Sequence, residues 1–150
     1  MVYIIFILSV IFIFAGIYFF LFKTKPEFGS GKIKIGEATF AVEIAGTLRS
    51  RAQGLSGRES MDEQNGMVFV FTIPAKYGFW MKDMRFPIDI VWIRGGVVIG
   101  ITENAPAAKG GVLSLKNYYP PDNVDMVLEL NAGTAGKFGL KTGDNVALTR

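Results

Sequence analysis

The first residues of the chain divide it into two parts of different character. From Val2 to Phe22 the sequence VYIIFILSVIFIFAGIYFFLF contains no charged side chain. A helix needs about 20 apolar residues to cross a bilayer, whereas a cleaved signal peptide has an apolar core of about 7–15 residues behind a basic start. We therefore expect one uncleaved transmembrane helix over residues 2–22, a linker over residues 23–31 and one folded domain over residues 32–150.

The composition of the chain excludes several kinds of chemistry. It contains no Cys and no His, which removes disulfides, thiol catalysis, zinc–thiolate sites and imidazole catalysis. The net charge is only +3 and the basic residues are scattered, so no nucleic-acid surface is predicted. The glycines do not form a phosphate loop and the acidic residues do not form a calcium loop. We expect neither a cofactor nor a metal.

After the linker, short apolar runs alternate with glycine turns. Gly36-Glu37 and Gly95-Gly96 each separate two strand-like runs, which predicts two hairpins. Thr47 is placed to cap a short helix that Gly54 or Gly57 ends. Further strands are expected over 67–72, 90–93, 124–130 and 144–149, and a second short helix within 132–140. This pattern predicts a mainly β fold, a small sandwich or barrel with one or two short helices, preceded by the single N-terminal transmembrane helix.

Three blocks of sequence resemble the DUF192 family, also called UPF0127. They are GLSGRESMDEQNGMVFVF (residues 54–71), GFWMKDMRFPIDIVWI (residues 78–93) and VLELNAGTAGKFGLKTGDNV (residues 127–146), and the resemblance covers roughly residues 33–149. It implies a small β domain without an assigned reaction. Relatives often carry an export signal or anchor, which favours an extracytoplasmic domain. The lysines that follow the span favour the cytoplasm instead, but they are spread out and make a soft signal. We expect the domain outside.

Asp89 is the first candidate site residue. It follows Pro87 at the start of an apolar strand, where a buried carboxylate must be paired or hydrogen-bonded. The family pattern holds one Arg before and one after its Gly-Leu pair, and these positions are Arg51 and Arg58 here. The sequence therefore predicts a structural ion pair or backbone brace for Asp89, with a site carboxylate as the alternative.

Aromatic residues beside charges supply the candidate ligand site. Trp80 lies near Lys82 and Arg85, a combination suited to an anionic or sugar-acid ligand; the alternative is that Trp80 packs in the core and the charges are solvated. Tyr118 and Tyr119 belong to a long loop, residues 105–125. This loop is predicted either to pack on the sheet through its tyrosines or to form a flap over a pocket.

Three function classes follow from these observations. We favour a membrane-anchored, non-catalytic module that binds an envelope glycan or a protein partner. A structural subunit of a membrane complex is the first alternative. The second is a hydrolase with a carboxylate pair, whose candidate members are Asp83, Asp89, Glu129 and Asp144. Of these, Asp83 stands where many relatives carry Asn, Asp144 is expected to brace a turn, and Glu129 points opposite to Leu128 and Leu130 in its strand.

Overall fold

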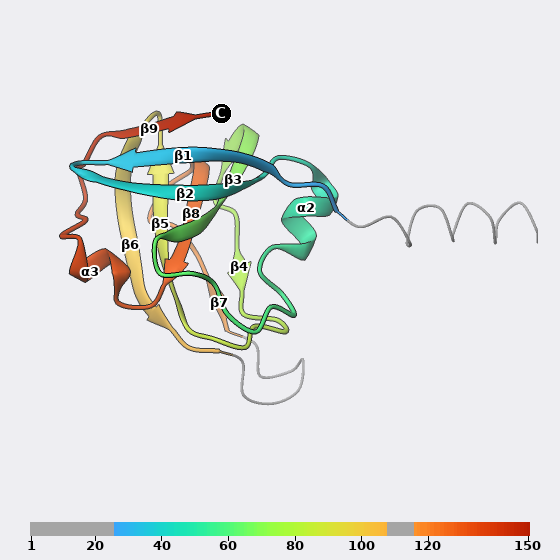
Figure 1. The fold of residues 1–150 in the computed structure, drawn as a ribbon. Helices are drawn as coiled ribbons and strands as arrows, with labels where there is room; N and C mark the ends of the chain where they lie inside the picture. The colour runs from blue at the N-terminus through green and yellow to red at the C-terminus, as the bar shows by residue number, and fades with distance from the viewer. Residues whose placement is uncertain (1–25, 108–115) are drawn as a thin grey trace, which may run out of the picture.

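The computed structural model describes residues 26–107 and 116–150, which form a mainly β domain with two short helices (Figure 1). Seven strands make one curled sheet in the order β6-β5-β8-β3-β2-β1-β9. Their bounds are β1 Gly29–Ile35, β2 Ala38–Ala45, β3 Asn65–Ala75, β5 Ile88–Arg94, β6 Val97–Ala105, β8 Val124–Asn131 and β9 Val146–Thr149. The helices are α2 (Leu48–Gln53) and α3 (Thr134–Lys137), and β4 (Phe79–Trp80) pairs with β7 (Asn117–Tyr118) as a separate ribbon.

Both predicted hairpins are confirmed. Ile35 pairs with Ala38 across the first turn, and Arg94 pairs with Val97 across the second. Gly36 has a φ of 55°, and Gly95 and Gly96 have φ values of 56° and 76°. Glycine adopts this left-handed region without the steric penalty of a Cβ atom. The glycines therefore form the turns that join β1 to β2 and β5 to β6.

The sheet curls until its two edges meet at one end, which makes it a half-barrel. β9 pairs with β1, and an isolated bridge joins Val97 of β6 to Asn145. The amide of Val98 donates to the carbonyl of Asp144 at 3.0 Å. The Asp144 carboxylate accepts the backbone N–H of Lys141 at 2.9 Å, so the turn brace predicted for this residue is confirmed.

Helix α2 connects β2 to β3, which pair in parallel. Thr47 is its N-cap, as predicted: the Thr47 hydroxyl accepts the Ser50 amide at 3.1 Å, and the Ser50 hydroxyl accepts the Thr47 amide at 3.0 Å. Gly54 ends the helix with a positive φ. This crossover carries α2 to one side of the sheet, while α3 lies on the other side of the domain (Figure 1).

Both faces of the central strands are buried. The inner cluster fills the curl with side chains from β1, β2, β5, β8 and α3, including Ile33, Phe40, Val91 and Leu128. The outer cluster lies between the sheet and the α2 and β4–β7 segments, and includes Leu55, Met67, Ile90 and Trp92. Successive side chains of a strand point to opposite faces, so neighbours such as Ile90 and Val91 belong to different clusters.

The N-terminal part of the predicted organisation is only partly described. Strand β1 begins at Gly29, so residues 29–31 belong to the sheet, where Gly29 pairs with Ile44. The linker, predicted over residues 23–31, therefore ends before Gly29. The predicted span, residues 2–22, lies outside the described residues. Within residues 26–107 and 116–150, no helix has the length and apolar character needed to cross a membrane.

Candidate functional site

A cavity of about 220 Å³ opens on the outer face of the sheet, beside α2. Its walls are mainly apolar and aromatic, with Leu55, Phe69, Phe71, Tyr77, Phe79 and Trp80 among the lining residues. Two ionisable side chains, Arg51 and Glu129, also line it. A concave apolar space with a few convergent polar groups is the usual form of a small-molecule site.

The aromatic residues of the cavity support one another. The rings of Phe71 and Tyr77 stack with centroids 3.7 Å apart and an interplanar angle of 12°. Phe79 meets Phe69 edge to face at 4.9 Å and meets Trp92 of the outer cluster at 5.6 Å. The Tyr77 hydroxyl donates to the Ile73 carbonyl at 2.6 Å. These contacts fix the rings, so the cavity wall is formed before a ligand arrives.

Glu129 is a buried carboxyl group that faces this cavity. It pairs with Met67 of β3 and Ile90 of β5, both outer-cluster residues, and it is only 6% exposed. Its Oε2 atom is buried and has no hydrogen-bond partner among the described residues. Burial raises the pKa of Glu129 to about 8, against the opposing charge of Arg58. The group is therefore a neutral acid at pH 7, with an O–H to donate.

Arg51 is held at the cavity by backbone carbonyls. It lies in the last turn of α2, and its Nη1 atom donates to the carbonyls of Gly46 at 2.8 Å and Val70 at 3.0 Å. Its guanidinium carbon lies 5.1 Å from the centroid of the Phe71 ring. These contacts use one of the three guanidinium nitrogens, so Arg51 is a positioned cation with further donors.

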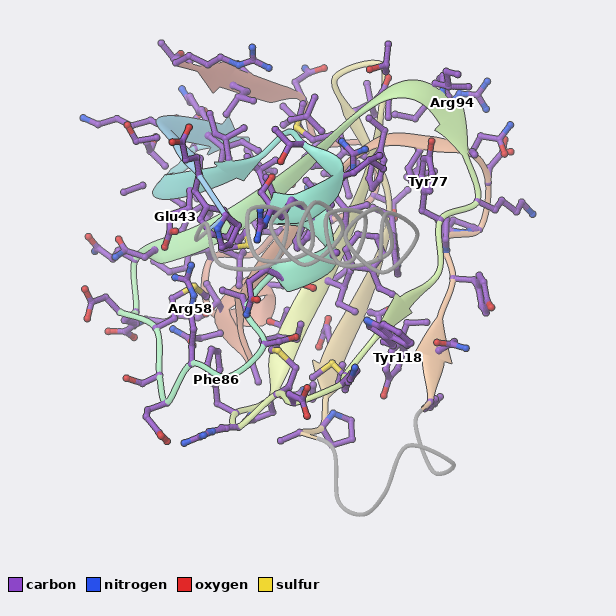
Figure 2. All side chains as sticks on the ribbon, turned by 90° about the vertical axis from the view of Figure 1, so that its right-hand side faces the viewer. Glu43, Arg58, Tyr77, Phe86, Arg94 and Tyr118 are labelled. Atoms are coloured by element: carbon purple, nitrogen blue, oxygen red, sulfur yellow. The ribbon has the colours of Figure 1, made fainter. Side chains whose placement is uncertain are left out.

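Arg58 lies on the same face and pairs with Glu43. Its two terminal nitrogens donate to the two carboxylate oxygens, with Nη2 to Oε2 at 2.8 Å, and Figure 2 shows the two side chains together beside β2. The hydrogen bonds from Arg58 lower the pKa of Glu43, and the same contact raises the pKa of Arg58. Glu43 of β2 is the partner of Met67 in β3, and Met67 is the partner of Glu129 in β8, so this ion pair lies two strands away from Glu129.

The predicted ion pair between Asp89 and Arg51 or Arg58 is wrong. Asp89 is fully buried, and its two oxygens accept the backbone N–H groups of Asn104 and Ala135, each at 2.8 Å. The backbone brace, the other part of the prediction, is what the structure contains. The ion pair cannot form because Asp89 and the two arginines lie on opposite faces of the sheet. Asp89 alternates with Ile88 and Ile90 along β5, so its side chain points away from the outer cluster, where both arginines lie.

Trp80, Lys82 and Arg85 line a second hollow next to the cavity, and Trp80 borders both. The Trp80 ring is 53% exposed, and the Lys82 ammonium lies 5.6 Å from its centroid. Arg85 pairs with Glu59. The structure thus brings the three predicted residues together, with Trp80 on the surface rather than in the core.

The two tyrosines neighbour residues of the cavity wall but do not line the cavity themselves. Tyr118 is buried and pairs with Phe79 in the β4–β7 ribbon, whereas Tyr119 is exposed and lies against Gly78. Among the described lining residues of the two hollows, neither tyrosine occurs. Tyr118 therefore packs against the domain, as expected for a loop that packs on the sheet through its tyrosines. Residues 108–115 of this loop lie outside the described residues.

Asp83 has a backbone role. Its φ is 56°, in the left-handed region that Asp and Asn adopt more readily than most residues. Its carbonyl accepts the amide of Gly57 at 2.8 Å, and the neighbouring carbonyl of Lys82 accepts the Ser56 hydroxyl at 2.9 Å. This turn ties the segment after α2 to the segment after β4, and so shapes the rim of the cavity.

Sequence reasoning missed the role of the aromatic side chains Phe71 and Tyr77 and of Glu129 as a cavity group. The alternation Leu128-Glu129-Leu130 placed Glu129 opposite to the leucines, which is correct. It could not show that the opposite face is buried too. The only available signal was the apolar character of both faces of β5, whose residues Ile88 to Ile93 include a single polar side chain.

Comparison with known proteins gives the family of the domain. The DUF192 family profile, described as "Uncharacterized ACR", matches residues 31–148. The chain belongs to the DUF192 family. This DUF192 domain also matches a crystal structure from Sinorhizobium meliloti 1021, described as a proposed transcription regulator, with 28% identity and a TM-score of 0.72. The match covers 83% of this chain and 98% of that one.

A second crystal structure has a similar fold. It is a protein of unknown function from Novosphingobium aromaticivorans, with 27% identity, a TM-score of 0.71, and coverage of 77% of this chain and 83% of that one. No curated protein matches the chain significantly. The relatives therefore share the architecture of this DUF192 domain and assign no reaction to it.

Proposed function

We propose that the domain is a non-catalytic binding module that takes a small ligand into the cavity beside α2. The observation that carries this proposal is Glu129: a buried carboxyl group that faces an aromatic cavity, with an oxygen that lacks a partner among the described residues. A buried polar group without a hydrogen bond costs free energy. A ligand that hydrogen-bonds Glu129 would recover that free energy on binding.

The arrangement of carboxyl groups supports binding over hydrolysis. Glycoside hydrolysis uses two carboxyl groups about 5–10 Å apart across the scissile bond. Of the described residues that line the cavity, Glu129 alone carries a carboxyl group. The other candidates of the pair have structural contacts: Asp89 braces two amides, Asp144 braces a turn, and the backbone of Asp83 forms the turn at the rim.

A fragment screen tests the proposed function. Full-length protein in detergent is exposed to single-ring fragments that are neutral, anionic and cationic, and binding is followed by NMR of the Leu55 and Met84 methyl groups, which line the cavity. We expect at least one class to shift these signals and to raise the melting temperature. Glu129→Ala removes the carboxyl group and is expected to weaken this binding, and Glu103→Ala, at an exposed Glu on β6, is its matched control. If no fragment shifts the cavity signals, the proposal fails.

We also propose that residues 2–22 anchor the domain and that the domain lies outside the cytoplasm, where it meets envelope ligands. The support is the uncharged run and its length. The protein is expected to remain in the membrane fraction after alkaline and high-salt washes. Protease added to spheroplasts is expected to digest the domain. Full protection of the domain, in a preparation where a known external protein is cut, would place it in the cytoplasm instead.

A further inference from the structure

We infer that the ligand of the cavity is a small aromatic carboxylate, with its ring between the aromatic walls and its carboxylate bound by Arg51 and Glu129. The inference rests on the proposed function and specifies its ligand class. Three features carry it: the size of the cavity, the charges around it, and the hydrogen-bonding capacity of its two ionisable side chains.

The size and walls of the cavity fit one substituted ring. A cavity of about 150 Å³ lined by apolar side chains holds benzene, and this cavity measures about 220 Å³. The difference leaves room for a small polar substituent. Phe69, Phe71 and Phe79 line the space, and Phe79 meets the other two rings edge to face. An aromatic ligand prefers the same edge-to-face or offset contacts.

The charges around the cavity favour an anion. Arg51 from α2 is the one permanently charged side chain among the described lining residues, since Glu129 is neutral at pH 7. The charge of Arg58, which approaches from the segment after α2, is compensated by Glu43 of β2. At the rim, Lys82 and Asp83 carry opposite charges, and Arg85 pairs with Glu59. The local charge that remains uncompensated is therefore that of Arg51.

The hydrogen-bonding groups complement a carboxylate. Nη1 of Arg51 is used by two backbone carbonyls, and the remaining guanidinium nitrogens are donors. The protonated Glu129 has an O–H donor, and a bond from a neutral acid to a carboxylate oxygen is a short, charge-assisted one. An ammonium ligand would need Glu129 to lose its proton and would lie in the same small cavity as the Arg51 cation.

A series of three probes tests the charge of the ligand. Benzoate, benzamide and benzylamine share one ring and differ in charge, and their binding to the full-length protein in detergent is measured at pH 6.5 by calorimetry. We expect benzoate to bind at least about tenfold tighter than either of the others, because hydrogen bonds to a charged group are stronger than those to a neutral one. Equal or tighter binding of benzamide or benzylamine overturns the inference and leaves the proposed function intact. If no probe of the fragment screen binds, both fail.

Variants and pH locate the interaction. Arg51→Gln is expected to weaken benzoate binding about tenfold or more and to leave benzamide binding unchanged, while the exposed Arg94→Gln changes neither. Between pH 7 and pH 9 benzoate affinity is expected to fall about tenfold, as the protonated fraction of Glu129 falls. Glu129→Gln keeps a donor and should bind benzoate equally at both pH values. Affinity that rises with pH in the wild type contradicts the inference.

Discussion

Two buried carboxyl groups lie on neighbouring strands of the sheet, and their surroundings differ in one respect. Asp89 of β5 points into the inner side of the curl, where the amides of Asn104 and Ala135 each donate to one of its oxygens. Glu129 of β8 points to the outer side, and its Oε2 atom is buried without such a donor in the part of the chain that the structure describes. The fold satisfies the first group by itself and leaves the second with unused hydrogen-bonding capacity.

This difference distinguishes a carboxyl group with a structural role from one that is available to bind a ligand. Both residues interrupt apolar strands, and both are nearly inaccessible to solvent. Asp89 holds two segments, the end of β6 and the start of α3, onto β5. The Oε2 atom of Glu129 has no hydrogen-bond partner among the described residues, and the side chain borders an aromatic cavity. Burial alone therefore does not identify the function of a carboxyl group; the presence or absence of partners does.

The largest predicted effect is that of Asp89→Ala. The change removes the acceptor of two backbone N–H groups, that of Ala135, which is buried, and that of Asn104, which is partly buried. An unsatisfied buried donor costs about 1–3 kcal/mol, so the free energy of unfolding should fall by about 3 kcal/mol. Urea unfolding followed by tryptophan fluorescence measures it. Asp122→Ala, in an exposed ion pair with Arg94, is the matched control and should cost about 1 kcal/mol or less. A loss below about 1 kcal/mol for Asp89→Ala would show that its brace does not support the fold.

The second prediction concerns the pH dependence of stability. The pKa of Glu129 is raised to about 8 in the folded state, from an ordinary value of 4.5 in the unfolded chain. Between these values the folded state holds one more proton on Glu129, so the contribution of this group to stability is most favourable below pH 4.5 and becomes less favourable as pH rises. From pH 6 to pH 8 the expected loss is about 2 kcal/mol. Glu129→Gln should remove this slope, and a slope that persists in the variant would assign it to another group.

The third prediction concerns the cap of α2. Thr47→Ala removes the hydroxyl that accepts the Ser50 amide, and loss of such a cap costs about 1 kcal/mol. Because α2 carries Arg51, the same variant should also weaken ligand binding. Thr142→Ala, at an exposed turn, serves as the control for both measurements. Unchanged binding in Thr47→Ala would mean that the two carbonyls alone hold Arg51 in place.

The smallest expected effect belongs to the rim. The double variant Lys82→Ala with Arg85→Ala removes exposed charges that border the second hollow, and surface changes of this kind usually alter stability by no more than about 0.5 kcal/mol. Ligand affinity should change little, and the change should be smaller still at high salt, because salt screens the interaction of exposed charges with the ligand. A loss of binding as large as that of Arg51→Gln would move the site from the cavity to the rim.

The sequence was sufficient to predict those elements that depend only on residues close together in the chain. Glycine turns predicted both hairpins, Thr47 predicted the start of α2, and the run from Val124 predicted β8, because each depends on neighbours along the chain. Asp144 was correctly expected to brace a turn for the same reason. The family resemblance supplied the pairing partners proposed for Asp89, and these were wrong.

The parts that failed depend on which layer covers a strand. Alternation placed Glu129 opposite to Leu128, but solvent exposure of that face depends on α2 and on the β4–β7 ribbon, which are distant in sequence. The parallel pairing of β2 with β3 has no local signal either. The cavity is assembled from α2, β3, β4 and β8, and only the three-dimensional fold brings these segments together.

The ionisation of Glu129 in the free protein tests the central claim most directly. The side-chain carboxyl carbon of Glu129 is followed by NMR across a pH titration of protein labelled with carbon-13 on glutamate, and Glu129→Gln assigns its signal. We expect a midpoint near pH 8, with the group neutral at pH 7. A midpoint near 4.5, the ordinary value of a solvated Glu, would show that the carboxyl is hydrated or paired and would contradict the proposed site.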